Sequence, residues 1–168
     1  MDNENLNRLM LNAGERQFWI KPWGHPDFSP EEGEQVFNDS TITIGFARTP
    51  NSVRVGDVLI VYRIKVSKLM FVAEVVASPV HVTAEEMERH PHLKRWQWNI
   101  ETRNLTPTFG TYWHRYGLRP FSLAAEYGER NPHDKVKLGS LQFGNDKLRV
   151  SEGFGKFLIN EILRLPTP

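Results

Sequence analysis

Two dense apolar runs in the middle of the chain form its clearest pattern. DVLIVYRI (residues 57–64) and LMFVAEVVA (residues 69–77) are rich in β-branched side chains, and the polar residues KVSK separate them. Runs of this length on both sides of a short polar turn predict an antiparallel hairpin of buried strands. Gly56 marks the turn that leads in, and Pro79 ends the second strand. Ile60, Tyr62, Val72 and Ala73 are expected to lie in the core.

Shorter alternating segments predict further strands around this hairpin. Residues 17–23 (QFWIKPW) and 41–47 (TITIGFA) combine aromatic and β-branched residues. In RWQWNIETRNLT, Trp96, Trp98 and Ile100 would share one face of a strand. KVKLGSLQF is a candidate for one more strand.

Capping residues predict short helices between these strands. Ser29 followed by Pro30 is a helix start, and the helix would continue to about Phe37. Thr83 and Glu86 form a capping box, which predicts a helix over residues 84–90.

The two ends of the chain differ in pattern. Residues 1–16 are polar without a clear period and predict a flexible arm or a short helix. Ser151 opens a terminal helix with one apolar stripe, formed by Phe154, Phe157, Leu158, Ile162 and Leu165. Residues 104–135 are punctuated by proline and glycine and read as an irregular insertion.

The chain therefore predicts one α+β domain over residues 17–168, with a small β-barrel flanked by short helices. It has 168 residues, of which 39% are hydrophobic and 24% charged, as expected for a folded globular protein. There is no cysteine and no apolar run of the roughly 20 residues that cross a bilayer. A cytoplasmic protein without a cofactor is the simplest expectation.

The net charge is only +1, but charge is unevenly distributed. Residues 48–68 and 94–119 each carry five basic side chains and one acidic side chain, whereas residues 22–47 carry five acidic and no basic ones. A basic face is one interpretation of this pattern, and local fluctuation is the other.

Three segments resemble the PUA-like superfamily, and within it an EVE or YTH-type domain. They are FWIKPW, the hairpin VRVGDVLIVYRIKVSKLMFVAEVVASP, and the terminal strand and helix LRVSEGFGKFLINEIL. The resemblance implies a compact β-barrel flanked by helices that binds nucleic acid, often by holding a modified base in an aromatic pocket. Residues 104–135 match no motif of the family, and Phe46 is the aromatic residue nearest to a tryptophan that the family has before the hairpin.

A base-binding pocket needs aromatic faces that offset the cost of unstacking, and cations near the phosphates. The candidate ligand-binding residues are Trp19, Lys21, Trp23, His25, Phe46, Arg48 and Trp113. We expect Trp23, with Trp19 or Phe46, to form an aromatic wall, because Pro22 ends the strand there. His25 would contact a base edge, and Lys21 and Arg48 would reach the rim. In the alternative, Trp23 caps the core and Lys21 is simply solvated.

Two other functions stay open at the level of sequence. The first is a nuclease or hydrolase that uses His25, Asp27 and Lys21, although nucleophile, phosphate-loop and HExxH motifs are absent. The second is a protein-interaction domain with residues 104–135 as its contact surface. The histidines of HPD and HPH lack a third ligand with metal-site spacing, so no metal is expected. DNA and RNA are both possible partners.

Overall fold

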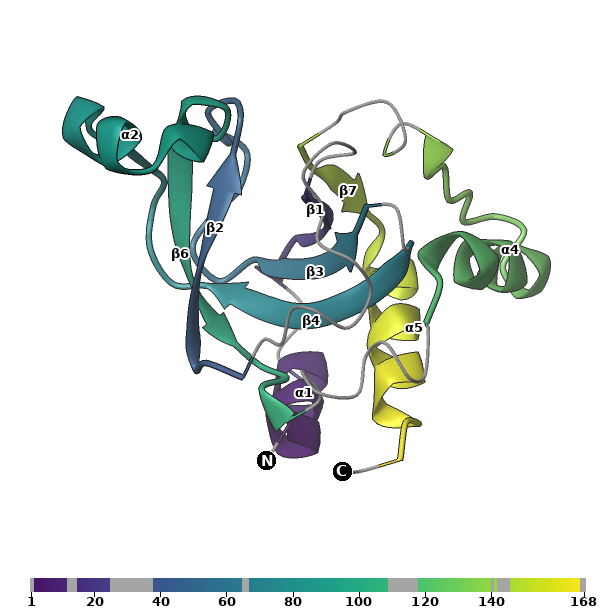
Figure 1. Cartoon of the computed structure of the whole chain (residues 1–168). Helices are drawn as coiled ribbons and strands as arrows, with labels where there is room; N and C mark the ends of the chain where they lie inside the picture. The colour runs from purple at the N-terminus through teal and green to yellow at the C-terminus, as the bar shows by residue number, and fades with distance from the viewer. Residues whose placement is uncertain are drawn as a thin grey trace.

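The structure is a computed structural model of the chain, and it describes residues 2–11, 15–24, 38–64, 67–108, 118–139, 141 and 146–166. The elements in chain order are α1 (Asp2–Leu11), β1 (Phe18–Trp23), β2 (Thr41–Phe46), β3 (Val58–Arg63), β4 (Lys68–Val75), β5 (Val80–His81), α2 (Ala84–Arg89), the 3₁₀ helix η2 (Pro91–Lys94), β6 (Trp98–Asn104), α4 (Pro120–Arg130), β7 (Leu148–Val150) and α5 (Glu152–Leu163) (Figure 1).

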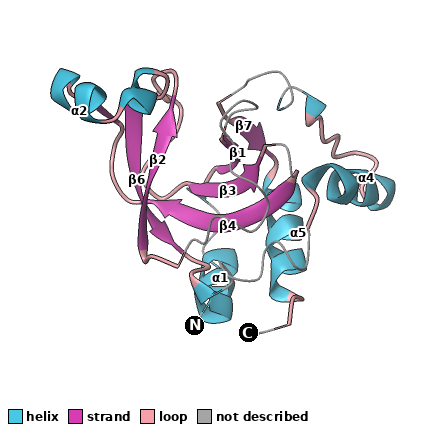
Figure 2. Cartoon of the chain, viewed as in Figure 1, coloured by secondary structure: helices cyan, strands magenta, loops and turns pink. Residues whose placement is uncertain are grey.

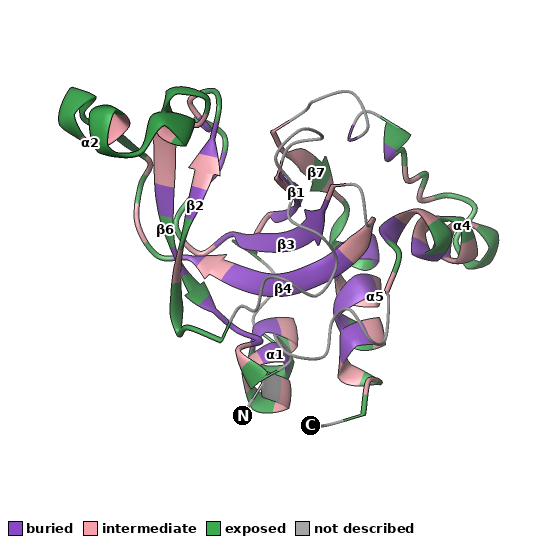
Figure 3. Cartoon of the chain, viewed as in Figure 1, coloured by how far each residue is buried: buried purple, intermediate pink, exposed green. Residues whose placement is uncertain are grey.

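The β3–β4 hairpin is the centre of the fold, which confirms the strongest prediction from the sequence. The two strands pair antiparallel, with Ile60 opposite Val72 and Leu59 opposite Ala73. Every residue of β3 is buried, as is nearly all of β4 (Figure 3). Burial on both faces explains why the two runs are almost continuously apolar instead of alternating.

The strands form one mixed seven-stranded sheet in the order β2-β6-β4-β3-β1-β7, with β5 paired to β6. β1 runs parallel to β3, and the remaining pairs are antiparallel. Among the described strands, no pairing joins β2 to β7, so closure into the predicted barrel is not shown. The fold is α+β, as the sequence predicts.

Three of the helices lie together, and α2 stands apart from them. α1 packs against α5, and α5 also contacts α4 (Figure 2). Ser151 caps α5 by accepting a hydrogen bond from Phe154 N, as predicted. Leu6 and Leu9 of α1 are buried, so this segment contributes to the core where the sequence suggested a flexible arm or a short helix.

The α2 helix has the predicted Thr83–Glu86 capping box but buries none of its residues. It is followed directly by η2, which is also without a buried residue. In Figure 3, α2 is largely exposed and lies beside the upper end of β6. None of the helices in the described part of the chain is long and apolar enough to cross a membrane.

Two sequence predictions need correction. Residues 104–135, predicted to be irregular, contain the helix α4, in which Pro120 occupies the first turn and Leu123 and Tyr127 are buried. The expected strand in residues 135–143 is absent from the part of that segment that the structure describes, and β7 lies further along. The helix predicted between Pro30 and Phe37 lies outside the described residues.

Candidate functional site

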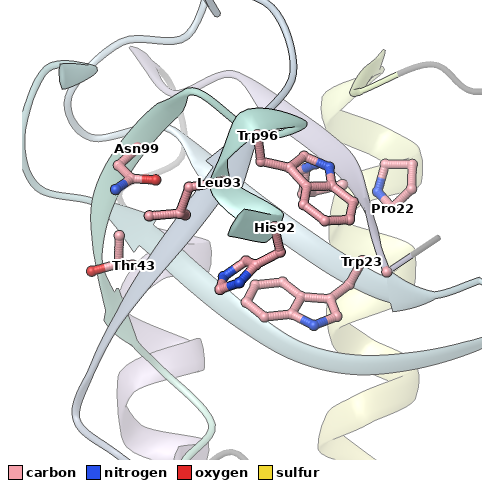
Figure 4. A pocket seen from close by; sticks show the side chains of 10 residues that line it. Pro22, Trp23, Thr43, His92, Leu93, Trp96 and Asn99 are labelled. Atoms are coloured by element: carbon pink, nitrogen blue, oxygen red, sulfur yellow. The ribbon is translucent and has the colours of Figure 1, made fainter. Parts of the chain in front are cut away.

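One cavity of about 500 Å³ opens where the end of β1 faces β2, η2 and the start of β6. It is lined by Lys21, Pro22, Trp23, Gly24, Thr43, Gly45, His92, Leu93, Trp96 and Asn99. Figure 4 shows the indoles of Trp23 and Trp96 close to each other, with the His92 ring beside Trp23. Thr43 and Asn99 lie at the other side of the cavity from Pro22. The volume and the mixture of aromatic and polar walls are typical of small-ligand sites.

Trp23 reaches the cavity because β1 ends with it. Its ring meets the ring of Phe71 edge to face, with centroids 5.8 Å apart and planes at 73°. The next residue, Gly24, has a φ of +93°, a conformation that turns the chain away and that glycine adopts at little cost. Trp23 is therefore half-buried, held by the core on one side and exposed to the cavity on the other.

Trp96 forms a second aromatic wall and packs closely against β2. A Cβ atom placed on Gly45 would lie 3.1 Å from the Cβ of Trp96, so a larger residue there would push the indole away. The guanidinium of Arg95 lies 5.7 Å from the Trp96 ring centroid, which is within cation–π range. Arg95 is exposed and places a positive charge beside this wall.

Lys21 lines the same cavity but is only 3% exposed. Its ammonium nitrogen lies 4.5 Å from the centroid of the Phe46 ring. Burial lowers the pKa of Lys21 to about 8, the attraction of Asp146 partly opposes this, and repulsion from Lys147 adds to it. The group is still mostly protonated at neutral pH, so the cavity has a cation in its wall.

Only part of the site predicted from sequence gathers at this cavity. Lys21 and Trp23 line it, although Lys21 is buried and not at an exposed rim. Phe46 is fully buried beneath the Lys21 ammonium and supports that side chain without lining the cavity. His25 and Trp113 lie outside the described residues, as does Asp27 of the alternative enzyme site.

Trp19 and Arg48 have other places in the structure. Trp19 is buried, and its indole N–H donates to the carboxylate of Asp57 at 3.0 Å, so it belongs to the core. Asp57 also accepts from the backbone N–H of Gln17 and of Arg54, which ties the start of β1 to the turn before β3. Arg48 is exposed, and its backbone N–H donates to Asp146 at 2.8 Å.

The sequence prediction missed most of the opposite wall. Trp96 was assigned to a strand, whereas β6 begins at Trp98 and Trp96 precedes it. His92 and Leu93 come from η2, and Thr43 and Asn99 from strands with no motif. A usable signal was Pro91, which breaks the chain between α2 and RWQW and favours a short turn there.

Metal chemistry has no support in the described part of the chain. No group of three or more histidine, aspartate or glutamate side chains there is arranged to hold a metal ion. His90 and His92 lie with ring centroids 5.9 Å apart and without a third ligand.

Comparisons with known proteins show similarity in fold only. No protein-family model matches the sequence, and no curated protein matches it. The fold is similar to that of a hypothetical protein from Leishmania major, at 14% identity and a TM-score of 0.57, over 89% of this chain and 96% of that one. It is also similar to the YTH domain of the Zygosaccharomyces rouxii MRB1 protein, which was solved in complex with N6-methyladenosine RNA. That match has 10% identity and a TM-score of 0.50, over 92% of this chain and 91% of that one.

The second match shows that the fold is similar to that of a YTH domain. The assignment to the PUA-like superfamily, and within it to an EVE or YTH type, stays a prediction.

Proposed function

We propose that this protein is a non-catalytic nucleic-acid-binding module that holds one extruded base between Trp23 and Trp96. The observation that carries the proposal is the pair of indoles, from the end of β1 and from the segment just before β6, in the walls of one cavity. Stacking on aromatic side chains offsets the cost of taking a base out of its neighbours' stack, by about 1–3 kcal/mol for each base.

The surroundings of the cavity fit this role. Arg95 adds a cation beside Trp96, where it would meet the phosphates that flank an inserted base. Thr43 and Asn99 offer polar groups to a base edge. The YTH domain of similar fold was solved with N6-methyladenosine RNA, which favours a single base, modified or not, as the recognised unit. The complete barrel that this resemblance implies remains part of the proposal.

Binding of fluorescein-labelled RNA and DNA of about nine nucleotides tests the proposal, because small single-strand-binding domains cover strands of this length. Trp23→Ala and Trp96→Ala should each weaken binding by about 1–3 kcal/mol, or roughly 5- to 150-fold. Trp98→Ala is the matched control, because Trp98 is also half-buried but packs edge-on against His81 outside the cavity. Its affinity should stay within about twofold of wild type.

The melting temperature of each variant separates loss of binding from loss of fold. Trp23 also supports Phe71, so Trp23→Ala should lower stability moderately while the variant remains folded. Equal affinity of wild type and both pocket variants would contradict the proposal, as would the absence of binding to any oligonucleotide.

A further inference from the structure

Lys21 carries a positive charge at a buried position. It lies in β1 between Ile20 and Pro22, with its ammonium over the Phe46 ring. No hydrogen bond or ion pair to this ammonium is seen among the described residues. A lysine whose charge is buried without an acceptor costs stability, and an apolar side chain of equal length would fill the same space.

Lys21 is one of the residues that line the cavity. In β1 it lies two residues before Trp23, so the two side chains share one face of the strand. A ligand that enters between Trp23 and Trp96 would therefore be a further partner for the charge, besides Asp146, which attracts it from within the protein. An ammonium has three N–H donors and no acceptor, so that partner has to present an acceptor.

Base edges differ in what they offer to such a donor. Guanine presents O6 and N7, and uracil or thymine presents O4, all of which are acceptors. Adenine and cytosine place an amino group, a donor, at the position of that carbonyl, and on this edge adenine keeps N7 as its one acceptor. Two donors that face each other in a desolvated site leave both unpaired, and a site built to donate rejects such a ligand strongly.

We propose that Lys21 makes the pocket selective for a base with a carbonyl edge, of the guanine or uracil class, over adenine and cytosine. The inference rests on the proposed function and adds the class of base to it. A phosphate oxygen is the other acceptor that nucleic acid offers. However, the cavity is walled by the flat indoles of Trp23 and Trp96 and by the apolar Leu93, which suit a base, and the exposed Arg95 is better placed for phosphates.

The test uses short RNA strands of abasic ribose units with one central base: guanine, uracil, adenine, cytosine or N6-methyladenine. A fully abasic strand measures the backbone contribution alone. Wild type should bind the guanine or uracil strand at least about tenfold more tightly than the adenine strand, as expected for one well-placed donor–acceptor contact. Lys21→Met, which keeps the length of the side chain, should reduce the preference for guanine or uracil over adenine to about threefold or less.

Lys147→Met is the control for loss of charge. Lys147 is half-buried and lies with its ammonium 5.7 Å from the Trp19 ring, away from the cavity walls. This variant should weaken all strands alike and keep the base preference. Lys21→Gln, which restores a neutral donor, should recover part of the preference.

The outcomes separate this inference from the proposed function. In one outcome, binding depends on Trp23 and Trp96, but wild type and Lys21→Met prefer the guanine or uracil strand over the adenine strand by the same factor. This would overturn the role of Lys21 and leave the base-binding function standing. A preference of wild type for the adenine or N6-methyladenine strand would also overturn the role of Lys21 and leave the base-binding function standing. No strand binding more tightly than the abasic control would overturn both.

Discussion

Replacing Lys21 by methionine should make the protein more stable. Lys21 is 3% exposed, and its burial lowers the pKa of the side chain from 10.5 to about 8. The difference of about 2.5 pKa units, at 1.36 kcal/mol for each, means that the charged form costs about 3 kcal/mol in the folded state. Methionine fills the same volume and carries no charge, so Lys21→Met should gain about 3 kcal/mol at about pH 7.

The stability that Lys21→Met gains over wild type should decrease as the pH rises. Between about pH 8 and 10.5 the unfolded chain keeps the Lys21 proton while the folded chain loses it, so wild-type stability increases with pH in this window. At about pH 9.5 the advantage of Lys21→Met should be only about 1 kcal/mol. Below pH 8 both states are protonated and the full cost persists. The neighbours that set the pKa, Asp146 and Lys147, are the same in both proteins, as is Tyr62, whose pKa burial raises to about 12.

Urea unfolding followed by tryptophan fluorescence at about pH 7 and about pH 9.5 measures both effects. A Lys21→Met variant that is less stable than wild type at about pH 7 would refute the reasoning, because Lys21 would then be a structural residue. A stability gain that does not narrow with pH would also refute it, because the gain would not come from the charge.

Three further substitutions test the structure around the pocket. Val72→Asp places an unpaired carboxylate at a fully buried position of β4 and should unfold the protein, as judged by circular dichroism; an unchanged melting temperature would mean that the hairpin is not central. Asp57→Ala removes the acceptor of the Trp19 indole and of two backbone N–H groups and should cost at least about 3 kcal/mol in urea unfolding, whereas a loss below about 1 kcal/mol would show that these contacts are dispensable. Gly45→Val should displace the Trp96 indole, weaken oligonucleotide binding about tenfold and lower stability by about 1–3 kcal/mol; unaltered affinity would remove Trp96 from the site.

The central part of the fold could be predicted from the sequence because its signals are local. The hairpin, β1 and β2 follow from dense apolar or alternating runs. The helix α2 follows from its capping box, and α5 follows from its capping serine and a periodic apolar stripe. The helix α4 was missed because Pro120 and Gly128 were interpreted as breaks, although proline at the first turn of a helix is favourable. Its buried residues Leu123 and Tyr127 have helical spacing.

The pocket could be predicted only in part because its two walls are distant in sequence. Trp23 was identified from its place after Pro22 at the end of a strand, which depends on neighbouring residues alone. Trp96 joins it because β6 pairs with β2 and η2 turns the chain back, neither of which a local pattern encodes. The burial of Lys21 likewise depends on Phe46 of β2 lying beneath it.

The most direct test of the central claim is the response of the tryptophan indole N–H signals in ¹⁵N-labelled protein to an oligonucleotide. Titration with the abasic strand that carries one central guanine should shift the signals of Trp23 and Trp96, assigned through Trp→Phe variants. The signals of Trp19, whose N–H is bonded to Asp57, and of Trp98 should stay in place. Shifts confined to Trp19 or Trp98, or no shift at Trp23 and Trp96 under saturating strand, would contradict the account.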